Sequence, residues 1–185
     1  MSVPFRPTPA QLKAAVTKTV PDLIAPNLKI LFCGINPGLY SGATGHHFAR
    51  PGNKFWPALK LAGFTQAQLS PFDEHELLAR GLGVTNVVMR TTATAAELAK
   101  EEYVSGGKAL KRKAVKYKPR VVAFLGIGAF RDAFDLPKAV MGLQEMTIGP
   151  SHVWVLPNPS GLNAHYSVQK LAMEFEKLKA FIEKE

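Results

Sequence analysis

The sequence predicts an α/β fold, a three-layer α/β/α sandwich with a central, mainly parallel four-stranded sheet. Two observations support this prediction. Four short apolar runs rich in β-branched and aromatic residues are typical of strands buried on both faces. Helical patterns separate these runs, and strands that alternate with helices connect through right-handed crossovers that cover both faces of a parallel sheet. The predicted strands are residues 28–34, 83–88, 120–125 and 152–156.

The predicted helices fill the segments before, between and after these strands. Thr8 followed by Pro9 is a helix N-cap followed by proline at the first helical position. In the longest helix, glutamates come early and lysines late, an order that complements the helix dipole and favours a solvated face over a stripe that contacts DNA. The run at 146–149 is too short to predict a further, antiparallel strand. The predicted helices are residues 9–18, 53–62, 73–79, 95–117, 128–134 and 167–184.

Length and composition predict one domain. The 185 residues, 46% of them hydrophobic, fit a single domain over residues 26–185, preceded by an N-terminal arm with a short helix over residues 1–25. One cysteine, Cys33, excludes intramolecular disulfides and clusters that need several thiolates. No apolar run has the length of a signal sequence or a membrane span, so we expect a cytoplasmic protein.

The charge of the chain indicates an acidic partner. Lys and Arg number 23 against 14 Asp and Glu, a formal net charge of +9. A positive surface attracts polyanions such as nucleic acids, although charge alone does not single out a nucleic acid.

Two loops with related sequences follow two of the predicted strands. Gly34–Gly38 reads GINPG, and Leu156–Gly161 reads LPNPSG. In each, a proline holds the preceding asparagine in extended geometry and a glycine lets the backbone turn. Ligands bind beyond the carboxyl ends of strands in open α/β sheets, so we expect both asparagines at one binding edge. Either motif alone is also compatible with a plain turn.

Several kinds of site are excluded by spacing. The glycines match neither a dinucleotide fingerprint nor a phosphate loop. His46 and His47 are adjacent, and no further ligand at a useful spacing completes a metal site. We therefore expect no metal and no cofactor.

Three motifs in this order, GINPG, GHHFARPGNKFW and LPNPSGL, resemble the mismatch-specific uracil/thymine DNA glycosylase family, a branch of the uracil-DNA glycosylase superfamily. The resemblance extends from about Pro26 to the C-terminal helix. It implies a uracil-DNA glycosylase-like fold and a monofunctional DNA glycosylase that flips uracil out of DNA and hydrolyses its N-glycosidic bond, which initiates base excision repair. Thymine and damaged cytosine derivatives, especially opposite guanine, are further candidate bases. The implied partner is double-stranded DNA containing uracil or mismatches, bound by a monomer that is nucleoid-associated while on DNA.

The resemblance also implies roles for individual residues. Asn36 corresponds to the residue that positions the attacking water, and Thr92 to a threonine that helps to hold that water. Phe48 corresponds to the ring that stacks on the flipped base. The remaining wall of the base pocket is expected to include Ile35, Ser41 and His47.

The second loop corresponds to the wedge that enters the duplex. Leu162 is expected at its tip, where an apolar side chain fills the gap that the flipped base leaves. Some relatives have an arginine two residues beyond the tip that contacts the orphaned guanine, whereas here Ala164 and His165 follow. How this chain reads the opposite base stays open. The expected DNA-binding residues are Ser160, Gly161, Leu162 and Asn163.

The chemistry of an amide fits this reaction. Asn36 can accept a hydrogen bond from water but cannot remove its proton. Pyrimidine N-glycosidic cleavage tolerates that limit, because an oxocarbenium-like sugar forms first and a weak nucleophile captures it. The departing base anion needs donors, for which backbone N–H groups and nearby imidazoles are suited. We therefore expect a slow enzyme.

Three alternatives remain open at this point. The first is a glycosylase of the superfamily with a different base preference, although the cysteine count excludes its iron–sulfur branch. The second is a non-catalytic DNA-damage-binding protein. The third is a small nucleotide-metabolising enzyme, against which the missing phosphate loop argues.

Overall fold

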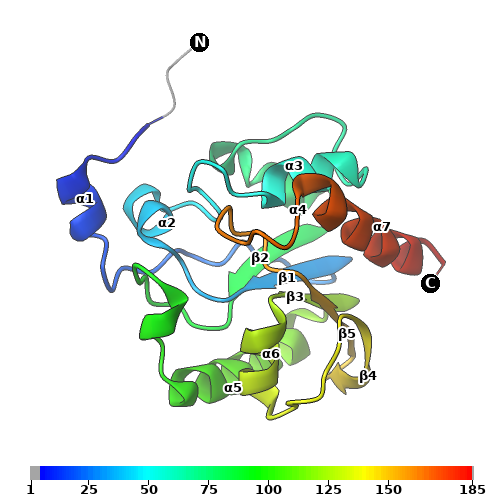
Figure 1. Ribbon diagram of the computed structural model, residues 1–185. Helices are drawn as coiled ribbons and strands as arrows, with labels where there is room; N and C mark the ends of the chain where they lie inside the picture. The colour runs from blue at the N-terminus through cyan, green and yellow to red at the C-terminus, as the bar shows by residue number, and fades with distance from the viewer. Residues whose placement is uncertain (1–4, 185) are drawn as a thin grey trace.

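The architecture is the predicted α/β/α sandwich. The computed structural model describes residues 5–184 and shows a sheet with helices on both faces (Figure 1). The strand order is β2-β1-β3-β5-β4, in which the first four strands are parallel and β4 is antiparallel to β5. The fold class is therefore confirmed, but the sheet has five strands rather than four. The strands are β1 (Ile30–Gly34), β2 (Leu82–Asn86), β3 (Val121–Leu125), β4 (Gly142–Ile148) and β5 (Ser151–Leu156).

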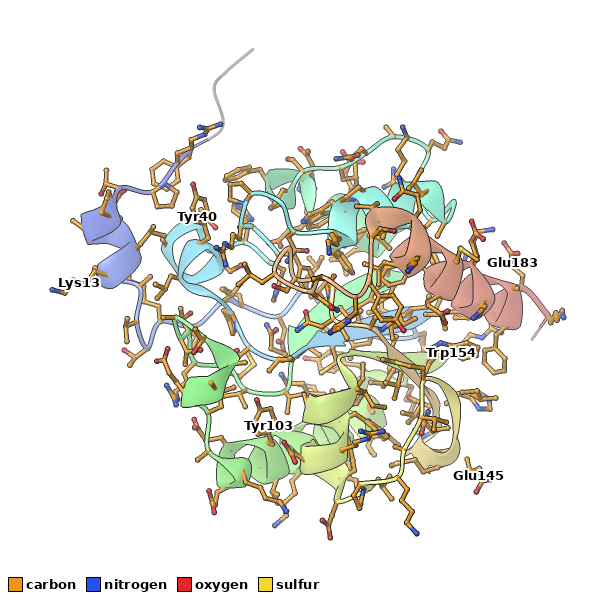
Figure 2. The ribbon with its side chains drawn as sticks, in the orientation of Figure 1. Lys13, Tyr40, Tyr103, Glu145, Trp154 and Glu183 are labelled. Atoms are coloured by element: carbon orange, nitrogen blue, oxygen red, sulfur yellow. The ribbon has the colours of Figure 1, made fainter. Side chains whose placement is uncertain are left out.

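The fifth strand lies at the edge of the sheet, and this position explains why the sequence did not predict it. An edge strand buries only one face, so it lacks the continuous apolar run of a central strand. In β4, exposed residues alternate with partly buried ones, and Glu145 lies on the outside of the molecule (Figure 2).

Each face of β1 supports its own core cluster. Phe32 belongs to the cluster on the side of α3 (Phe55–Leu61) and α7 (Val168–Lys184), where its ring stacks on Phe175 at a centroid distance of 5.7 Å. Cys33 belongs to the cluster on the side of α5 (Lys100–Tyr117) and α6 (Ile127–Phe134). Burial raises the pKa of the Cys33 thiol far above its ordinary value. With both faces covered, β1 is a rigid base for the loop that follows it.

Two predicted helices begin or end elsewhere. The predicted helix at 95–117 is interrupted by an extended Leu98, because two glutamates in succession cap the starts of two separate elements. Glu97 accepts a hydrogen bond from the Thr94 backbone N–H at 2.9 Å, and Glu102 accepts one from Ala99 at 2.9 Å. The predicted helix at 9–18 ends earlier, ahead of Thr17, which has a positive φ of 70°. The remaining helical elements are α1 (Pro9–Lys13), α2 (Leu39–Thr44), α4 (Glu76–Ala79), η1 (Pro71–Asp73) and η2 (Ala95–Glu97).

The segment between α1 and β1 packs against the sheet. Leu23 forms a β-bridge with Val84 through two backbone hydrogen bonds of 2.9 and 2.8 Å. Asp22 accepts a hydrogen bond from Thr85 and forms an ion pair with Lys113. These contacts fix the backbone at Pro21 close to the end of β2. Residues 1–4 of the expected N-terminal arm and residue 185 lie outside the described residues.

Candidate active site

A cavity of about 560 Å³ lies beyond the carboxyl ends of the parallel strands. Its lining includes the last residues of three strands, Gly34, Asn86 and Leu125, and Asn158 from the loop after β5. The strand order changes direction at β1, which has β2 on one side and β3 on the other. Ligands of open α/β folds bind at such a position. The structure thus brings the two asparagine loops to one edge.

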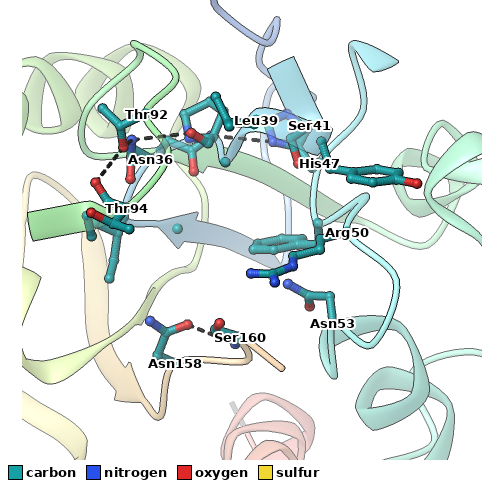
Figure 3. Close-up of a pocket in the computed structure, with 18 of the residues that line it drawn as sticks. Asn36, Leu39, Ser41, His47, Arg50, Asn53, Thr92, Thr94, Asn158 and Ser160 are labelled. Carbon is teal, nitrogen blue, oxygen red and sulfur yellow. Dashed lines mark hydrogen bonds between the residues drawn. The ribbon is translucent and has the colours of Figure 1, made fainter. Parts of the chain in front are cut away.

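Asn36 is held by its amide nitrogen. Nδ2 donates to the Thr92 hydroxyl at 2.7 Å (Figure 3), the Arg90 carbonyl at 3.0 Å and the Pro37 carbonyl at 3.2 Å. No residue between 5 and 184 donates a hydrogen bond to Oδ1. Because the amide protons are used and the side chain lines the cavity, Oδ1 is an acceptor available to a ligand or water.

Thr92 orients Asn36 from the neighbouring loop. Its side chain is 1% exposed, and its hydroxyl donates to the Thr94 carbonyl at 2.8 Å. Since that bond uses its single proton, the hydroxyl can only accept from Asn36. The expected contact between Thr92 and the water stays a prediction. The structure adds that Thr92 fixes the amide that would orient the water.

An ion pair holds the loop that carries these acceptors. The Arg90 guanidinium donates to both carboxylate oxygens of Glu102, at 2.6 and 3.0 Å. This contact lowers the pKa of Glu102 to about 2. A two-pronged contact of this kind restricts the direction of the Arg90 side chain, and with it the backbone whose carbonyl accepts from Asn36.

Phe48 lies above the end of β1. Its ring stacks on Phe55 at a centroid distance of 4.2 Å and an interplanar angle of 29°, and the residue lines the cavity. A Cβ atom on Gly34 would lie 3.5 Å from two atoms of the Phe48 ring. The Phe48 backbone has a positive φ of 51°, and the Phe48 carbonyl accepts a hydrogen bond from the Trp56 indole N–H at 3.3 Å. Phe48 therefore forms a rigid apolar wall.

His47 and Asn86 form a buried polar pair in the same cavity. His47 is 2% exposed, and its Nε2 lies 2.9 Å from the Pro21 carbonyl. Its Nδ1 lies 3.4 Å from Asn86 Nδ2, and its backbone N–H donates to Glu74. Burial lowers the pKa of His47 below its ordinary value, an effect that the Glu74 carboxylate opposes. The imidazole is therefore neutral near pH 7, and its one N–H group faces the Pro21 carbonyl.

Asn86 was not among the predicted site residues. It ends the apolar run of β2 and is 5% exposed. Ligands bind beyond the carboxyl ends of the strands, and this rule applies to a polar residue at the end of a strand as well as to the two loops. Asn86 could therefore have been predicted from the sequence.

The other predicted pocket residues lie around this centre. Ser41 is 6% exposed, and its hydroxyl accepts from the Ala49 backbone at 3.2 Å. Ile35 lines the cavity near Gly126. Arg50 and Asn53, which were not predicted, lie side by side in Figure 3 and line the same cavity.

The expected wedge loop has local hydrogen bonds and an exposed tip. Asn158 Oδ1 accepts from the Ser160 backbone at 2.9 Å, and the Asn163 side chain donates to the Asn158 carbonyl at 3.0 Å. The Ser160 hydroxyl accepts from the Leu162 backbone at 3.2 Å. Leu162 itself is 73% exposed. An ordered loop thus presents a large apolar side chain to solvent beside the cavity.

Lys54 connects the wedge loop to the segment that follows Phe48. Its ammonium donates to the Asn163 and Tyr166 carbonyls, both at 2.6 Å, and its backbone N–H donates to Pro159 at 2.9 Å. A Cβ atom on Gly161 would lie 2.6 Å from the Gly52 carbonyl, so glycine permits this close approach. Sequence analysis did not identify Lys54.

The family comparison agrees with this geometry. The model of the uracil DNA glycosylase superfamily matches residues 21–183. The chain belongs to the uracil DNA glycosylase superfamily. The solution NMR structure of a Methanosarcina acetivorans protein described as "a putative Uracil DNA glycosylase" is similar in fold. It has a TM-score of 0.60 and 20% sequence identity, and the match covers 89% of this chain and 99% of that one.

Membership of the uracil DNA glycosylase superfamily places the chain among hydrolases of N-glycosyl bonds that act on DNA. Within residues 5–184, no three or more His, Cys, Asp or Glu side chains form a group that could hold a metal ion. None of the helices in that range is long and apolar enough to cross a membrane.

Proposed function

We propose that this superfamily member is a monofunctional DNA glycosylase of the mismatch-specific branch. It acts as a monomer that flips uracil out of double-stranded DNA, hydrolyses the N-glycosidic bond and so initiates base excision repair. Thymine and damaged cytosine derivatives opposite guanine are further candidate substrates. The observation that carries the proposal is the amide of Asn36, whose nitrogen has three protein acceptors while its oxygen, in the cavity, has no donor among residues 5–184.

The proposed reaction proceeds in two stages. The C1′–N1 bond breaks first, and its electron pair leaves with the base, so that an oxocarbenium-like sugar forms. A water that donates a hydrogen bond to Asn36 Oδ1 then adds to C1′. One proton of that water passes to the departed base or to solvent, since an amide cannot accept it.

The departing base anion is stabilised by hydrogen-bond donors around the cavity. His47 supplies none in its neutral form, because its single N–H group faces the Pro21 carbonyl. This task falls to backbone N–H groups. Phe48 supplies the apolar face on which the base stacks, supported from behind by Phe55.

Base release from defined duplexes tests this proposal. Labelled duplexes carrying uracil, thymine or an etheno adduct opposite each normal base are scored for abasic sites under single-turnover conditions. We expect cleavage of uracil, and loss of that cleavage in Asn36→Ala with binding retained. Binding of damaged duplex without any base release would instead support a damage-binding protein. Activity on free nucleosides without duplex binding would support a nucleotide-metabolising enzyme.

A further inference from the structure

The segment after α1 runs beside the loop that supports the Asn36 amide. The Thr17 backbone N–H donates to the Thr91 carbonyl at 3.1 Å. In the other direction, the Thr91 backbone N–H donates to the Lys18 carbonyl at 2.8 Å. We call residues 14–20 the strap, because these reciprocal hydrogen bonds tie the N-terminal segment to the loop.

The strap is packed into the molecule near both of its ends. Ala15 and Val20 are 0% exposed. Between them, Thr19 forms an antiparallel β-bridge with Arg90. Leu12, at the end of α1 nearest the strap, lines the cavity itself. The strap is therefore a fixed part of the domain beside the active site.

Thr91 depends on the strap for its position. Its side chain makes no polar contact that would fix it, because the buried hydroxyl has no hydrogen-bond partner among residues 5–184. A Cβ atom on Gly42 of α2 would lie 2.5 Å from that hydroxyl, so α2 packs directly against Thr91. The two backbone groups of Thr91 are the ones that bond to the strap.

These backbone bonds orient the acceptors of Asn36 through two peptide planes. In a trans peptide, the C=O and N–H groups point in opposite directions. The N–H of Thr91 shares its plane with the Arg90 carbonyl, which accepts from Asn36 Nδ2 at 3.0 Å. The carbonyl of Thr91 shares its plane with the Thr92 N–H, which donates to the Pro37 carbonyl at 3.2 Å. Each plane is thus bonded to the strap on one edge and to the loop of Asn36 on the other.

The backbone of Thr17 has an unfavourable conformation at the point of contact. Its φ is 70°, in the left-handed region that β-branched residues rarely adopt. A residue keeps such a conformation only where the surrounding structure holds it there. The Lys18 N–H donates to the Ala15 carbonyl at 3.0 Å and closes a turn around Thr17. The strained residue is therefore the one whose N–H reaches Thr91.

We propose that Thr17 is a positioning residue for bond cleavage, because its backbone holds the Thr91 peptide groups and these in turn hold the Asn36 amide. This inference rests on the proposed function and extends it to the N-terminal segment, which lies outside the sheet. Without the strap, the Arg90 carbonyl is free to turn away from Nδ2. The amide of Asn36 then loses the orientation that offers Oδ1 to a water.

Two substitutions at position 17 separate positioning from simple packing. Thr17→Pro removes the backbone N–H and cannot adopt a positive φ. Thr17→Gly keeps the N–H and adopts a positive φ without strain. Both variants lose the same exposed side chain, so they differ in the backbone alone. A purely structural role predicts that DNA binding and cleavage weaken together in Thr17→Pro.

The readouts are the single-turnover rate on a duplex with one uracil opposite guanine and the Kd for the same duplex. A 2′-fluorinated uracil nucleotide serves for the Kd, because fluorine destabilises the cationic sugar and prevents cleavage. Thr17→Pro should lower the rate about 10- to 100-fold, the range for a slightly misplaced reacting group, and leave the Kd within about threefold. Thr17→Gly should stay within about threefold of wild type in both.

The Asn36→Ala background tests whether the strap acts through Asn36. Residues that act as one unit are not additive, so Thr17→Pro should lower the rate of Asn36→Ala by less than about threefold. An unchanged rate in Thr17→Pro, equal losses in Thr17→Pro and Thr17→Gly, or a full further loss in the Asn36→Ala background overturns the proposal.

A second measurement does not depend on turnover or on the folding of any variant. In the wild-type protein, hydrogen exchange followed by NMR should show the Thr17 and Thr91 N–H groups and the Asn36 side-chain amide opening as one unit. Their protection factors should agree within about tenfold. An Asn36 amide far less protected than the Thr91 N–H overturns the proposal. If the wild type releases no uracil, the proposed function fails, while the exchange rates still decide whether the strap holds Asn36.

Discussion

The loops after β1 and β5 share an Asn-Pro motif but use it in opposite ways. Asn36 donates to Arg90 and Thr92, which lie 54 and 56 positions away in the chain. Within the described part of the chain, the side-chain hydrogen bonds at Asn158 stay in its own loop, to Ser160 and Asn163, two and five positions away. In the first loop the fold orients one side-chain oxygen. In the second loop the asparagine shapes a turn, and Leu162 at the tip is exposed.

Under the proposed function, this difference assigns bond cleavage to the first loop and DNA deformation to the second. Damage to the first loop should affect bond cleavage on every substrate. Substitutions in the second loop should slow cleavage only on duplex DNA, where a stacked base must first be flipped out. The following substitutions test that division, beginning with the largest expected effect.

Asn36→Ala should lower the single-turnover rate by about 10²- to 10⁴-fold on duplex and single-stranded uracil DNA alike, the usual range for losing one positioned group. Binding to damaged duplex should change little. Asn158→Ala is the matched control from the second loop, and its defect should be confined to duplex. Equal defects of the two variants on single-stranded DNA would contradict the division.

Asn36→Asp should make the rate depend on pH. One carboxylate oxygen would face the Arg90 and Pro37 carbonyls, and this raises the pKa of the new side chain. The rate should therefore rise with pH as the carboxylate ionises and can accept a proton from water. The wild-type profile should be flat over the same range, and a parallel rise in both proteins would point to another titrating group.

Leu162→Ala should slow cleavage of duplex DNA by roughly 5- to 100-fold, which corresponds to about 1–3 kcal/mol for one large apolar side chain. Single-stranded uracil DNA has no stack to fill, so its cleavage should stay close to wild type. Single-turnover rates on both substrates measure this. Equal impairment would mean that Leu162 supports the pocket and that the wedge lies elsewhere.

Lys54→Met should produce a weaker form of the same duplex-specific defect, about 3- to 10-fold, because only part of the free energy of its two lost charged hydrogen bonds affects the inserted state of the loop. Lys54→Arg keeps donors for the Asn163 and Tyr166 carbonyls and is the conservative control. Cleavage rates of Lys54→Met combined with Leu162→Ala should be no lower than those of Leu162→Ala alone. Additive losses would show that Lys54 acts independently of the wedge.

The smallest expected effect is on stability and belongs to the first region. The pKa of His47 is lowered by burial in the folded state, so the unfolded chain binds a proton more readily. The free energy of unfolding should therefore have its full value above about pH 6.5 and should decrease as the pH falls below that value. Denaturant titrations of wild type and His47→Asn measure this, and the variant should lose this part of the decrease.

The features that could be predicted from the sequence are those that local chemistry and sheet topology determine. The Asn-Pro-Gly loops could be predicted because proline and glycine act on their own neighbours and parallel strands end at one edge. The acceptor role of Thr92 depends on a bond to Thr94 that no spacing rule reveals. Lys54 contacts residues 109 and 112 positions away, which only the assembled fold brings together. Asn86 carried a usable signal, because it ends the apolar run of β2 at the carboxyl edge of the sheet.

The burial of Cys33 gives the molecule a practical property. It is the one cysteine of the chain, it is 1% exposed, and its high pKa keeps the thiolate form scarce. Thiol reagents should therefore leave the folded protein unmodified. A single cysteine introduced at the exposed Ala164 would then be the sole attachment point for a fluorophore, two residues from Leu162. Insertion of the loop into a duplex could be followed in real time without first removing a native thiol.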